Sequence, residues 1–289
     1  MIPAPFDYHA PATLDEAIAL LERHGDAAKV LSGGQSLLPL MKLRLGFATH
    51  LVDIGRIPKL EYIEERDGFL RIGGSTRESA LERSELISSK YPILHDTAVV
   101  IADPLVRNRA TVGGNLAHGD PANDHPATML ALGAQVVARG RKGERVIAIE
   151  DFFQGLFTTA LLPEEILTEI RIPIPPAGSG GAYLKLERKV GDFATAGAAV
   201  QLTLKKGVIE QIGIGVTNAG PTPVKAKEAE RRLRGMKPDD AAIAEAAKLA
   251  AAATSPSADR RGSEAYKRAM AGVLVARAVR AALSRAGGN

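Results

Sequence analysis

The chain has 289 residues, 45% of them hydrophobic and 24% charged, which is typical of a soluble globular protein large enough for more than one core. The formal net charge is +4, and the absence of cysteine excludes disulfides and any cysteine-ligated iron–sulfur cluster in this chain. The first twenty residues lack a basic segment, and no apolar run reaches the roughly 18 residues of a membrane span. We therefore expect neither a signal peptide nor a transmembrane segment, and a cytoplasmic location.

The first fifty residues predict a β-α-β-like unit. Thr13 and Glu16 have the spacing of a capping box, and the apolar stripe that follows them ends at Gly25. Strands are expected at 28–31 and 50–54. Between them lie a double-glycine loop and a dense apolar segment, which we expect to be helical after Pro39.

The chain from 57 to 175 predicts short strands joined by glycine turns, with two helical stretches between them. A run rich in proline and glycine, 172–181, is typical of a linker. Beyond it we expect an antiparallel sheet with a hairpin turn at 206–207, followed by alanine-rich helices. The expected strands are 62–65, 69–73, 135–139, 145–149, 198–205 and 208–216, and the expected helices are 78–87, 92–101, 238–253 and 263–286. These elements predict an α+β fold in three units, 1–56, 57–177 and 178–289.

Basic residues gather near the C-terminus, where 225–285 holds 14 of the 37 Lys and Arg residues. This excess is more typical of a solvated helical face than of a surface for nucleic acid or an acidic partner, because no aromatic residues are interleaved. The six histidines, at 9, 24, 50, 95, 118 and 125, show no paired zinc-site spacing, so we expect no metal site.

Two double-glycine loops carry the strongest functional signal. Glycine lets the backbone approach a ligand closely, and successive N–H groups in such turns bind phosphates. A single Gly-Gly pair is also common in ordinary turns, but two in one chain indicate a pyrophosphate held from both sides, as in a dinucleotide. Neither loop matches a Walker A or a G-x-G-x-x-G motif. The first loop comprises Ser32, Gly33, Gly34, Gln35 and Ser36, and the second comprises Thr111, Val112, Gly113, Gly114 and Asn115.

The sequence around both loops resembles the medium subunits of the molybdenum hydroxylases, the xanthine dehydrogenase family. The resemblance covers essentially the whole chain, and two stretches, the opening 1–3 and 185–196, are similar to the carbon monoxide dehydrogenase branch of that family. The matching stretches are 32–44, 101–127, 165–168, 183–192 and 257–262.

The resemblance implies a vanillyl-alcohol-oxidase/PCMH-type FAD-binding fold, with two N-terminal subdomains and a C-terminal domain of antiparallel sheet and helices. It implies noncovalently bound FAD here, and [2Fe-2S] clusters and molybdopterin in an iron–sulfur small subunit and a molybdopterin large subunit. The complex would be a dimer of heterotrimers. It could associate with the inner face of the membrane. Electrons would pass from molybdenum through the clusters to FAD, and then to a quinone or similar acceptor. We therefore expect an oxidoreductase flavoprotein subunit with no catalytic acid or base of its own.

The resemblance also assigns residues to parts of the cofactor. The two glycine loops would hold the pyrophosphate and ribityl chain, although relatives often have histidine at the position of Gln35. Asp124 would accept a hydrogen bond from a cofactor hydroxyl, or else cap a helix beginning at Pro126. Lys185 would lie near the carbonyl edge of the flavin ring, or else be a surface lysine. Ring contacts would come from Ile101, from the backbone of Ile166 and Leu167, and from Phe193, where relatives often have Tyr or Trp.

Three functional alternatives remain at this stage. The chain could serve as the medium subunit of an aldehyde or N-heterocycle dehydrogenase, because substrate contacts would lie in another chain. It could also be a self-sufficient flavin oxidoreductase, which would need a proton donor beside the flavin. The third alternative is a redox-silent nucleotide-binding module, whose bound nucleotide would not bleach on anaerobic reduction. His118 could serve as a proton shuttle, but a turn histidine is the simpler interpretation.

Overall fold

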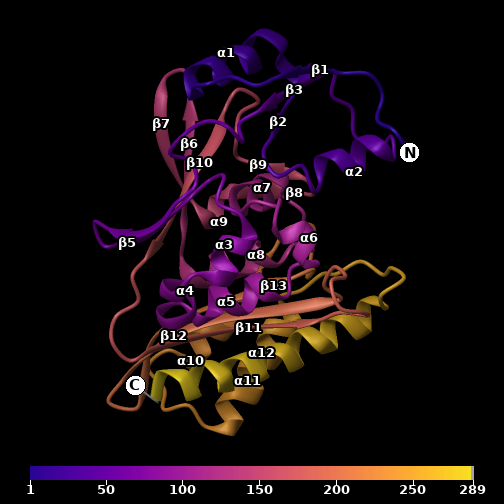
Figure 1. The fold of residues 1–289 in the computed structure, drawn as a ribbon. Coiled ribbons are helices and arrows are strands. Elements are labelled where there is room, and N and C mark those ends of the chain that lie inside the picture. The colour runs from indigo at the N-terminus through magenta and orange to yellow at the C-terminus, as the bar shows by residue number, and fades with distance from the viewer. Residues whose placement is uncertain (288–289) are drawn as a thin grey trace.

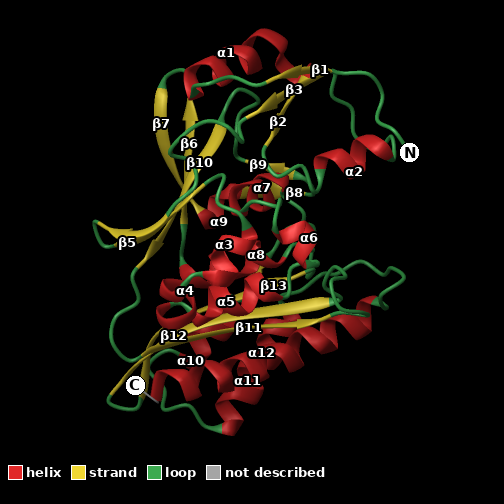
Figure 2. Cartoon of the chain, viewed as in Figure 1, coloured by secondary structure: helices red, strands yellow, loops and turns green. Residues whose placement is uncertain are grey.

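The computed structural model describes residues 1–287 and contains three main sheets that follow one another along the long axis of the molecule (Figures 1 and 2). Helices lie between the second and third sheets and beneath the third. Among the helices formed by residues 1–287, none combines the length and apolar character that a bilayer span requires. The mixed α+β architecture agrees with the sequence prediction.

The N-terminal sheet is parallel, with the order β1-β3-β2. The predicted helix packs on it through Ala17, Ile18 and Leu21, and Thr13 caps it by accepting the N–H of Glu16. The Glu16 carboxylate accepts from the N–H of Ala12, so the capping box is shifted by one residue. Bounds here are β1 (Asp7–His9), α1 (Leu14–His24), the 3-10 turn η1 (Gly25–Ala27), β2 (Ala28–Leu31), α2 (Leu37–Lys42) and β3 (His50–Asp53).

Two boundaries predicted from proline positions are wrong. Helix α2 begins two residues before Pro39, because a proline in the first helical turn removes only an N–H that has no intrahelical partner. The linker is confined to 174–178, since Ile170 and Ile172 are fully buried in a strand that pairs across the middle sheet. Proline therefore marks the end of a strand here rather than the start of a linker.

The middle sheet is antiparallel, with the order β4-β5-β10-β6-β7. The predicted helix 78–87 is two helices, because Ser84 ends the first and caps the second by accepting the N–H of Ile87. The strands are β4 (Ile63–Arg66), β5 (Phe69–Gly73), β6 (Gln135–Gly140), β7 (Gly143–Ala148) and β10 (Ile166–Pro173), and a small hairpin comprises β8 (Phe153–Gly155) and β9 (Thr158–Thr159). The helices are α3 (Glu78–Arg83), α4 (Glu85–Lys90), α5 (Pro92–Val99), α6 (Pro104–Arg107), α7 (Val112–His118), α8 (Asp124–Leu132) and α9 (Ile149–Phe152).

The C-terminal sheet is also antiparallel, and its predicted hairpin at 206–207 is confirmed. Its three helices cover one face, while α5 and α8 of the middle unit cover the other (Figure 1). A side chain at Gly213 or Gly215 would overlap the carbonyl oxygen of Ala131 or Ala127, so α8 rests directly on the strand backbone. The elements are β11 (Ser179–Leu186), β12 (Ala196–Lys205), β13 (Val208–Thr217), β14 (Val224–Lys225), α10 (Lys227–Leu233), α11 (Asp240–Ala252) and α12 (Glu264–Gly287). The division into 1–56, 57–177 and 178–289 stays a proposal.

Candidate functional site

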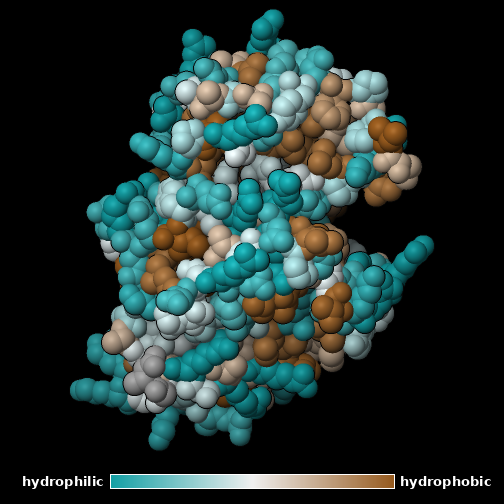
Figure 3. All heavy atoms as spheres, in the orientation of Figure 1, coloured by the Kyte–Doolittle hydropathy of each residue, from teal (hydrophilic) through white to brown (hydrophobic). Residues whose placement is uncertain are grey.

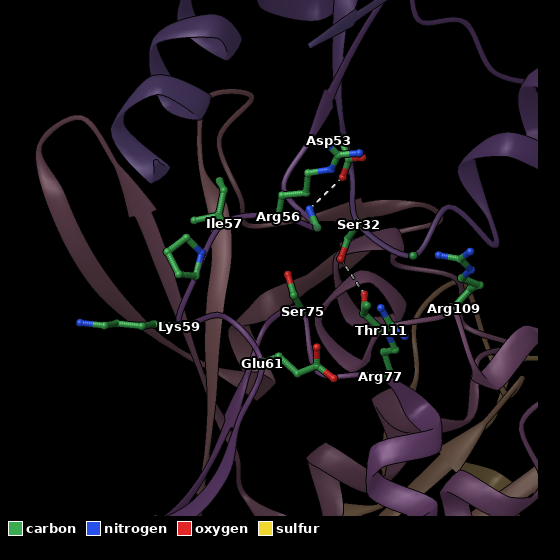
Figure 4. Close-up of a pocket in the computed structure, with 13 residues that line it drawn as sticks. Ser32, Asp53, Arg56, Ile57, Lys59, Glu61, Ser75, Arg77, Arg109 and Thr111 are labelled. Carbon is green, nitrogen blue, oxygen red and sulfur yellow. Dashed lines mark hydrogen bonds between the residues drawn. The ribbon is translucent and has the colours of Figure 1, made fainter. Parts of the chain in front are cut away.

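Three cavities of about 510, 300 and 90 Å³ surround Ser32, at the junction of the N-terminal and middle sheets. Figure 4 shows the largest, with Ser32 and Thr111 near its centre. Figure 3 shows the surface indented on the side between α2 and the C-terminal part of the chain. Both predicted glycine segments line these cavities, so residues far apart in the sequence form one site.

The first glycine loop leaves strand β2 and leads into α2. Gly34 has a φ of 73°, which favours glycine. Within residues 1–287, the backbone N–H groups of residues 33–36 donate to no protein acceptor. A loop with several free N–H groups in succession has the donors that anion binding requires.

The second glycine segment is a helix start rather than a loop. Thr111 caps α7, and the N–H groups of residues 112–115 bond to Thr76, Gly74 and Thr111. The prediction of a second set of free N–H donors is therefore wrong, because these donors are satisfied inside the protein. What the turn offers a ligand is the side chain of Asn115, whose buried Oδ1 has no hydrogen-bond partner among the described residues.

The two segments are in direct contact. The Oγ of Ser32 lies 3.0 Å from the Oγ1 of Thr111. A side chain at Gly33 would overlap the carbonyl oxygen of Arg109 and come within 2.8 Å of the Cα of Ala110. This close approach fixes the position of the free N–H groups relative to α7.

Four cations line the largest cavity, and the sequence analysis did not identify them. Among residues 1–287, none of them has a carboxylate within 4 Å, and the nearby Asp53 already accepts from Tyr8 and Gly55. Arg77 and Arg109 lie beside Thr111, and the backbone of Arg77 bridges to Thr111 (Figure 4). Arg109 lies within the matching stretch 101–127, whereas the others show no sequence signal. The four residues are Arg56, Lys59, Arg77 and Arg109.

The smallest cavity is an apolar slot at the start of β10. Ile166 and Leu167 line it together with Val30 and Ile54, next to the glycines of the second segment and Ser32 of the first. Ile101 does not line this slot, and its grouping with Ile166 and Leu167 around one ring stays a prediction.

Asp124 and Lys185 form a buried ion pair between α8 and β11. The Nζ of Lys185 lies 3.0 Å from the Asp124 carboxylate and 2.9 Å from the carbonyl oxygen of Val100, and Tyr183 donates to the other carboxylate oxygen at 2.5 Å. Burial raises the pKa of Asp124, and the charge of Lys185 opposes this rise. The Lys185 side chain is only 2% exposed and Asn123 occupies the N-cap of α8, so neither a surface lysine nor a cap is correct. Both side chains are engaged by protein groups.

Phe193 and Ile101 line none of the three cavities around Ser32. Ile101 is buried, and the adjoining Ala102 packs against Gly191 in the loop that carries Phe193. Phe193 is 49% exposed, and the guanidinium of Arg261 lies 5.8 Å from its ring centroid. Arg261 donates a hydrogen bond to Asp192, which holds this loop against the segment before α12 and lowers the pKa of Asp192 to about 2. The loop thus presents an anchored, solvent-exposed aromatic ring.

His118 ends α7 and lines the 300 Å³ cavity. It packs against Phe157, with ring centroids 5.0 Å apart, and burial lowers its pKa. Its ring makes no hydrogen bond to residues 1–287, so His118 does not hold its own turn in place as a turn histidine would.

Comparisons with known proteins agree with this geometry along the full chain. Residues 4–175 match the family described as FAD binding domain in molybdopterin dehydrogenase, and residues 181–282 match the CO dehydrogenase flavoprotein C-terminal domain. The chain is 47% identical to the carbon monoxide dehydrogenase medium chain of Afipia carboxidovorans, covering 99% of both. It is 38% identical to the 6-hydroxypseudooxynicotine dehydrogenase complex subunit alpha of Paenarthrobacter nicotinovorans, covering 99% of this chain and 97% of that one.

A solved structure is also similar to this chain over its full length. The carbon monoxide dehydrogenase from Hydrogenophaga pseudoflava that lacks the Mo-pyranopterin moiety matches with a TM-score of 0.97 and 47% identity, covering 99% of both chains. The match includes all three sheets, so it extends well beyond the two glycine segments, and it confirms the predicted fold. The chain therefore belongs to the FAD-binding medium subunits of the molybdenum hydroxylase family.

Proposed function

We propose that this chain is the flavin-carrying electron-transfer subunit of a carbon monoxide dehydrogenase-like complex. The observation that carries the proposal is the 47% identity to a carbon monoxide dehydrogenase medium chain over 99% of both sequences. The electrons would leave the flavin for an external acceptor such as a quinone. The complex would then work in the cytoplasm, at the inner membrane face where a membrane quinone is the acceptor.

The residues around Ser32 fit the charged middle of FAD. Free N–H groups at 33–36 and the cations Arg77 and Arg109 suit a pyrophosphate with its two negative charges. The orphaned Oδ1 of Asn115 is suited to accept a hydrogen bond from a hydroxyl next to it. We assign Ser32–Ser36 and Thr111–Asn115 to the pyrophosphate and ribityl chain on these grounds.

Two further places suit the ring systems of FAD. The apolar slot of Ile54, Ile166 and Leu167 fits the adenine, and the exposed ring of Phe193 fits the isoalloxazine. Lys185, paired with Asp124, donates to the carbonyl oxygen of Val100 and so fixes the backbone next to Ile101 at this second place. Bound FAD supplies the storage of two electrons, and the protein supplies position and charge.

Electrons must reach the flavin from another subunit, because the chain contains no cysteine to hold a cluster. An iron–sulfur small subunit and a molybdopterin large subunit would supply them, in a dimer of heterotrimers. The isolated chain is expected to bind FAD and to be bleached by dithionite, yet to show no turnover with carbon monoxide, aldehydes or purines. Adding both partner subunits should restore bleaching that depends on substrate.

The outcome of this experiment separates the alternatives. Turnover by the lone chain would establish a self-sufficient oxidoreductase, and a nucleotide that does not bleach would establish a redox-silent module. The 38% identity to a 6-hydroxypseudooxynicotine dehydrogenase subunit favours an N-heterocycle or aldehyde dehydrogenase as second candidate. Measuring which substrate bleaches the flavin in the reconstituted complex distinguishes these from carbon monoxide.

The flavin is expected to be held noncovalently. Covalent attachment needs a nucleophilic side chain, the chain has no cysteine, and His118 is the only histidine among residues 1–287 that lines the three cavities. Acid precipitation should therefore release all flavin to the supernatant. Yellow colour that stays in the washed pellet, and disappears in His118→Ala, would show a covalent tether.

A further inference from the structure

Three histidines distant in the sequence meet at the N-terminal sheet. His9 is the last residue of β1, and His50 is the first residue of β3, which pairs with β1. His24 is the last residue of α1, which packs on this sheet. One ring nitrogen from each lies within 4.8 Å of those of the other two, and His9 Nε2 is 3.2 Å from His50 Nδ1. We call these three residues the histidine cluster.

One pair in the cluster already has the spacing of two ligands on a tetrahedral metal ion. Zn–N bonds of about 2.0–2.1 Å place two ligand nitrogens roughly 3.3 Å apart, close to the distance between His9 and His50. The three rings are within 25–29° of parallel, so their lone pairs do not yet converge on one point. Rotation about χ2, which is a broad torsion in histidine, turns them toward a shared ion.

The charges around the cluster favour a cation. Asp7 pairs with His50 across the strands, and its carboxylate lies 3.5 Å from His50 Nδ1. The carboxylate makes no other ion pair within residues 1–287 and is mostly exposed, so it is free to turn toward an ion as a fourth ligand. Arg23, which directly precedes His24 on α1, opposes a cation, and the carboxylate of Asp7 offsets its charge.

The cluster is separate from the flavin cleft. None of its histidines lines the three cavities around Ser32. His50 begins β3, whereas the glycine loop follows the opposite end of the neighbouring parallel strand β2. A ligand at the cluster therefore need not compete with FAD.

We propose that His9, His24 and His50, with the carboxylate of Asp7, form a binding site for one borderline divalent cation such as Zn²⁺. Three imidazoles suit zinc and its transition-metal neighbours, whereas Mg²⁺ and Ca²⁺ prefer oxygen ligands. The bound ion would join β1, the end of α1 and β3, and so stabilise the edge of the sheet.

The test is calorimetric titration of the untagged, FAD-loaded full chain with Zn²⁺, with Mg²⁺ as the comparison ion. We expect one Zn²⁺ per chain, no binding of Mg²⁺, and a visible absorption band typical of tetrahedral Co²⁺ when cobalt replaces zinc. His24→Gln should weaken zinc binding at least tenfold and abolish the cobalt band. His95→Gln, on α5 and outside the cluster, is the matched control and should bind zinc unchanged.

A second variant, together with a measurement of flavin content, distinguishes loss of the zinc site from misfolding. His50→Gln alters the start of a strand, so its flavin content is measured alongside zinc binding. Variants that keep FAD and lose zinc support the site. Absence of zinc binding to the parent chain, or equal zinc affinity in the parent and in a folded His24→Gln variant, would overturn it.

Discussion

Replacing Gly33 by valine is expected to cause the largest loss of FAD of any single change in the cleft. The new side chain would overlap the carbonyl oxygen of Arg109 and approach the Cα of Ala110, and neither backbone atom can rotate away. The first loop must then move off α7, taking its free N–H groups with it. Overpacking of this kind costs roughly 1–3 kcal/mol, equivalent to about a 5- to 150-fold rise in the FAD dissociation constant.

The measurement is flavin content after gel filtration, together with the dissociation constant from fluorescence titration. Gly287→Ala is the matched control, because a side chain there meets nothing within 4 Å. Gly114→Val should act more weakly, through the cap of α7, since its Cβ would lie 2.7 Å from the Oγ1 of Thr111. A Gly33→Val protein that binds FAD like the parent would show that the first loop does not hold the cofactor.

Replacing Lys185 by methionine should produce the largest loss of stability. The change leaves the buried carboxylate of Asp124 without its cation, and removing one partner of a buried pair costs about 3–5 kcal/mol. For a chain of this size that corresponds to a fall in Tm of roughly 5–8 °C. Thermal unfolding followed by circular dichroism measures the effect.

Two further variants test whether the loss of stability comes from breaking the buried pair of Lys185 and Asp124. Lys248→Met changes a lysine on the exposed side of α11 and should leave Tm unchanged. Combining Lys185→Met with Asp124→Leu should recover most of the loss, because the hydroxyl of Tyr183 still has Thr217 as a partner. If Lys185→Met keeps the parental Tm but shifts the flavin spectrum, Lys185 contacts the flavin as the resemblance implied.

The sequence correctly predicted those elements that depend on interactions between residues close together in the chain. The cap at Thr13, the glycine after α1 and the hairpin at 206–207 each depend on residues a few positions apart. The prediction of free N–H groups in the second glycine segment was wrong because its structure depends on a distant contact. Glycine is a poor helix former, and α7 nevertheless begins there because Thr111 caps it and Gly113 packs against Gly74, 39 residues earlier in the sequence.

The features of the candidate site also separate into those with local causes and those that depend on distant residues. The free N–H groups of the first loop follow from the glycines themselves, so the sequence predicted them. The four cations of the large cavity, the pairing of Asp124 with Lys185 and the histidine cluster exist only because strands and helices bring distant residues together. A spacing rule cannot identify His9, His24 and His50, because they come from two strands and a helix.

The contact of α8 with Gly213 and Gly215 has a consequence for the order of events during translation. Helix α8 is complete at Leu132, but the strand that covers it arrives about eighty residues later. At roughly 5–20 residues per second, this leaves the apolar face of α8 open for several seconds on the ribosome. Tyr183 and Ala199 also complete the core of the middle unit. A nascent chain halted before residue 200 should therefore still need chaperones, however well its N-terminal sheet has formed.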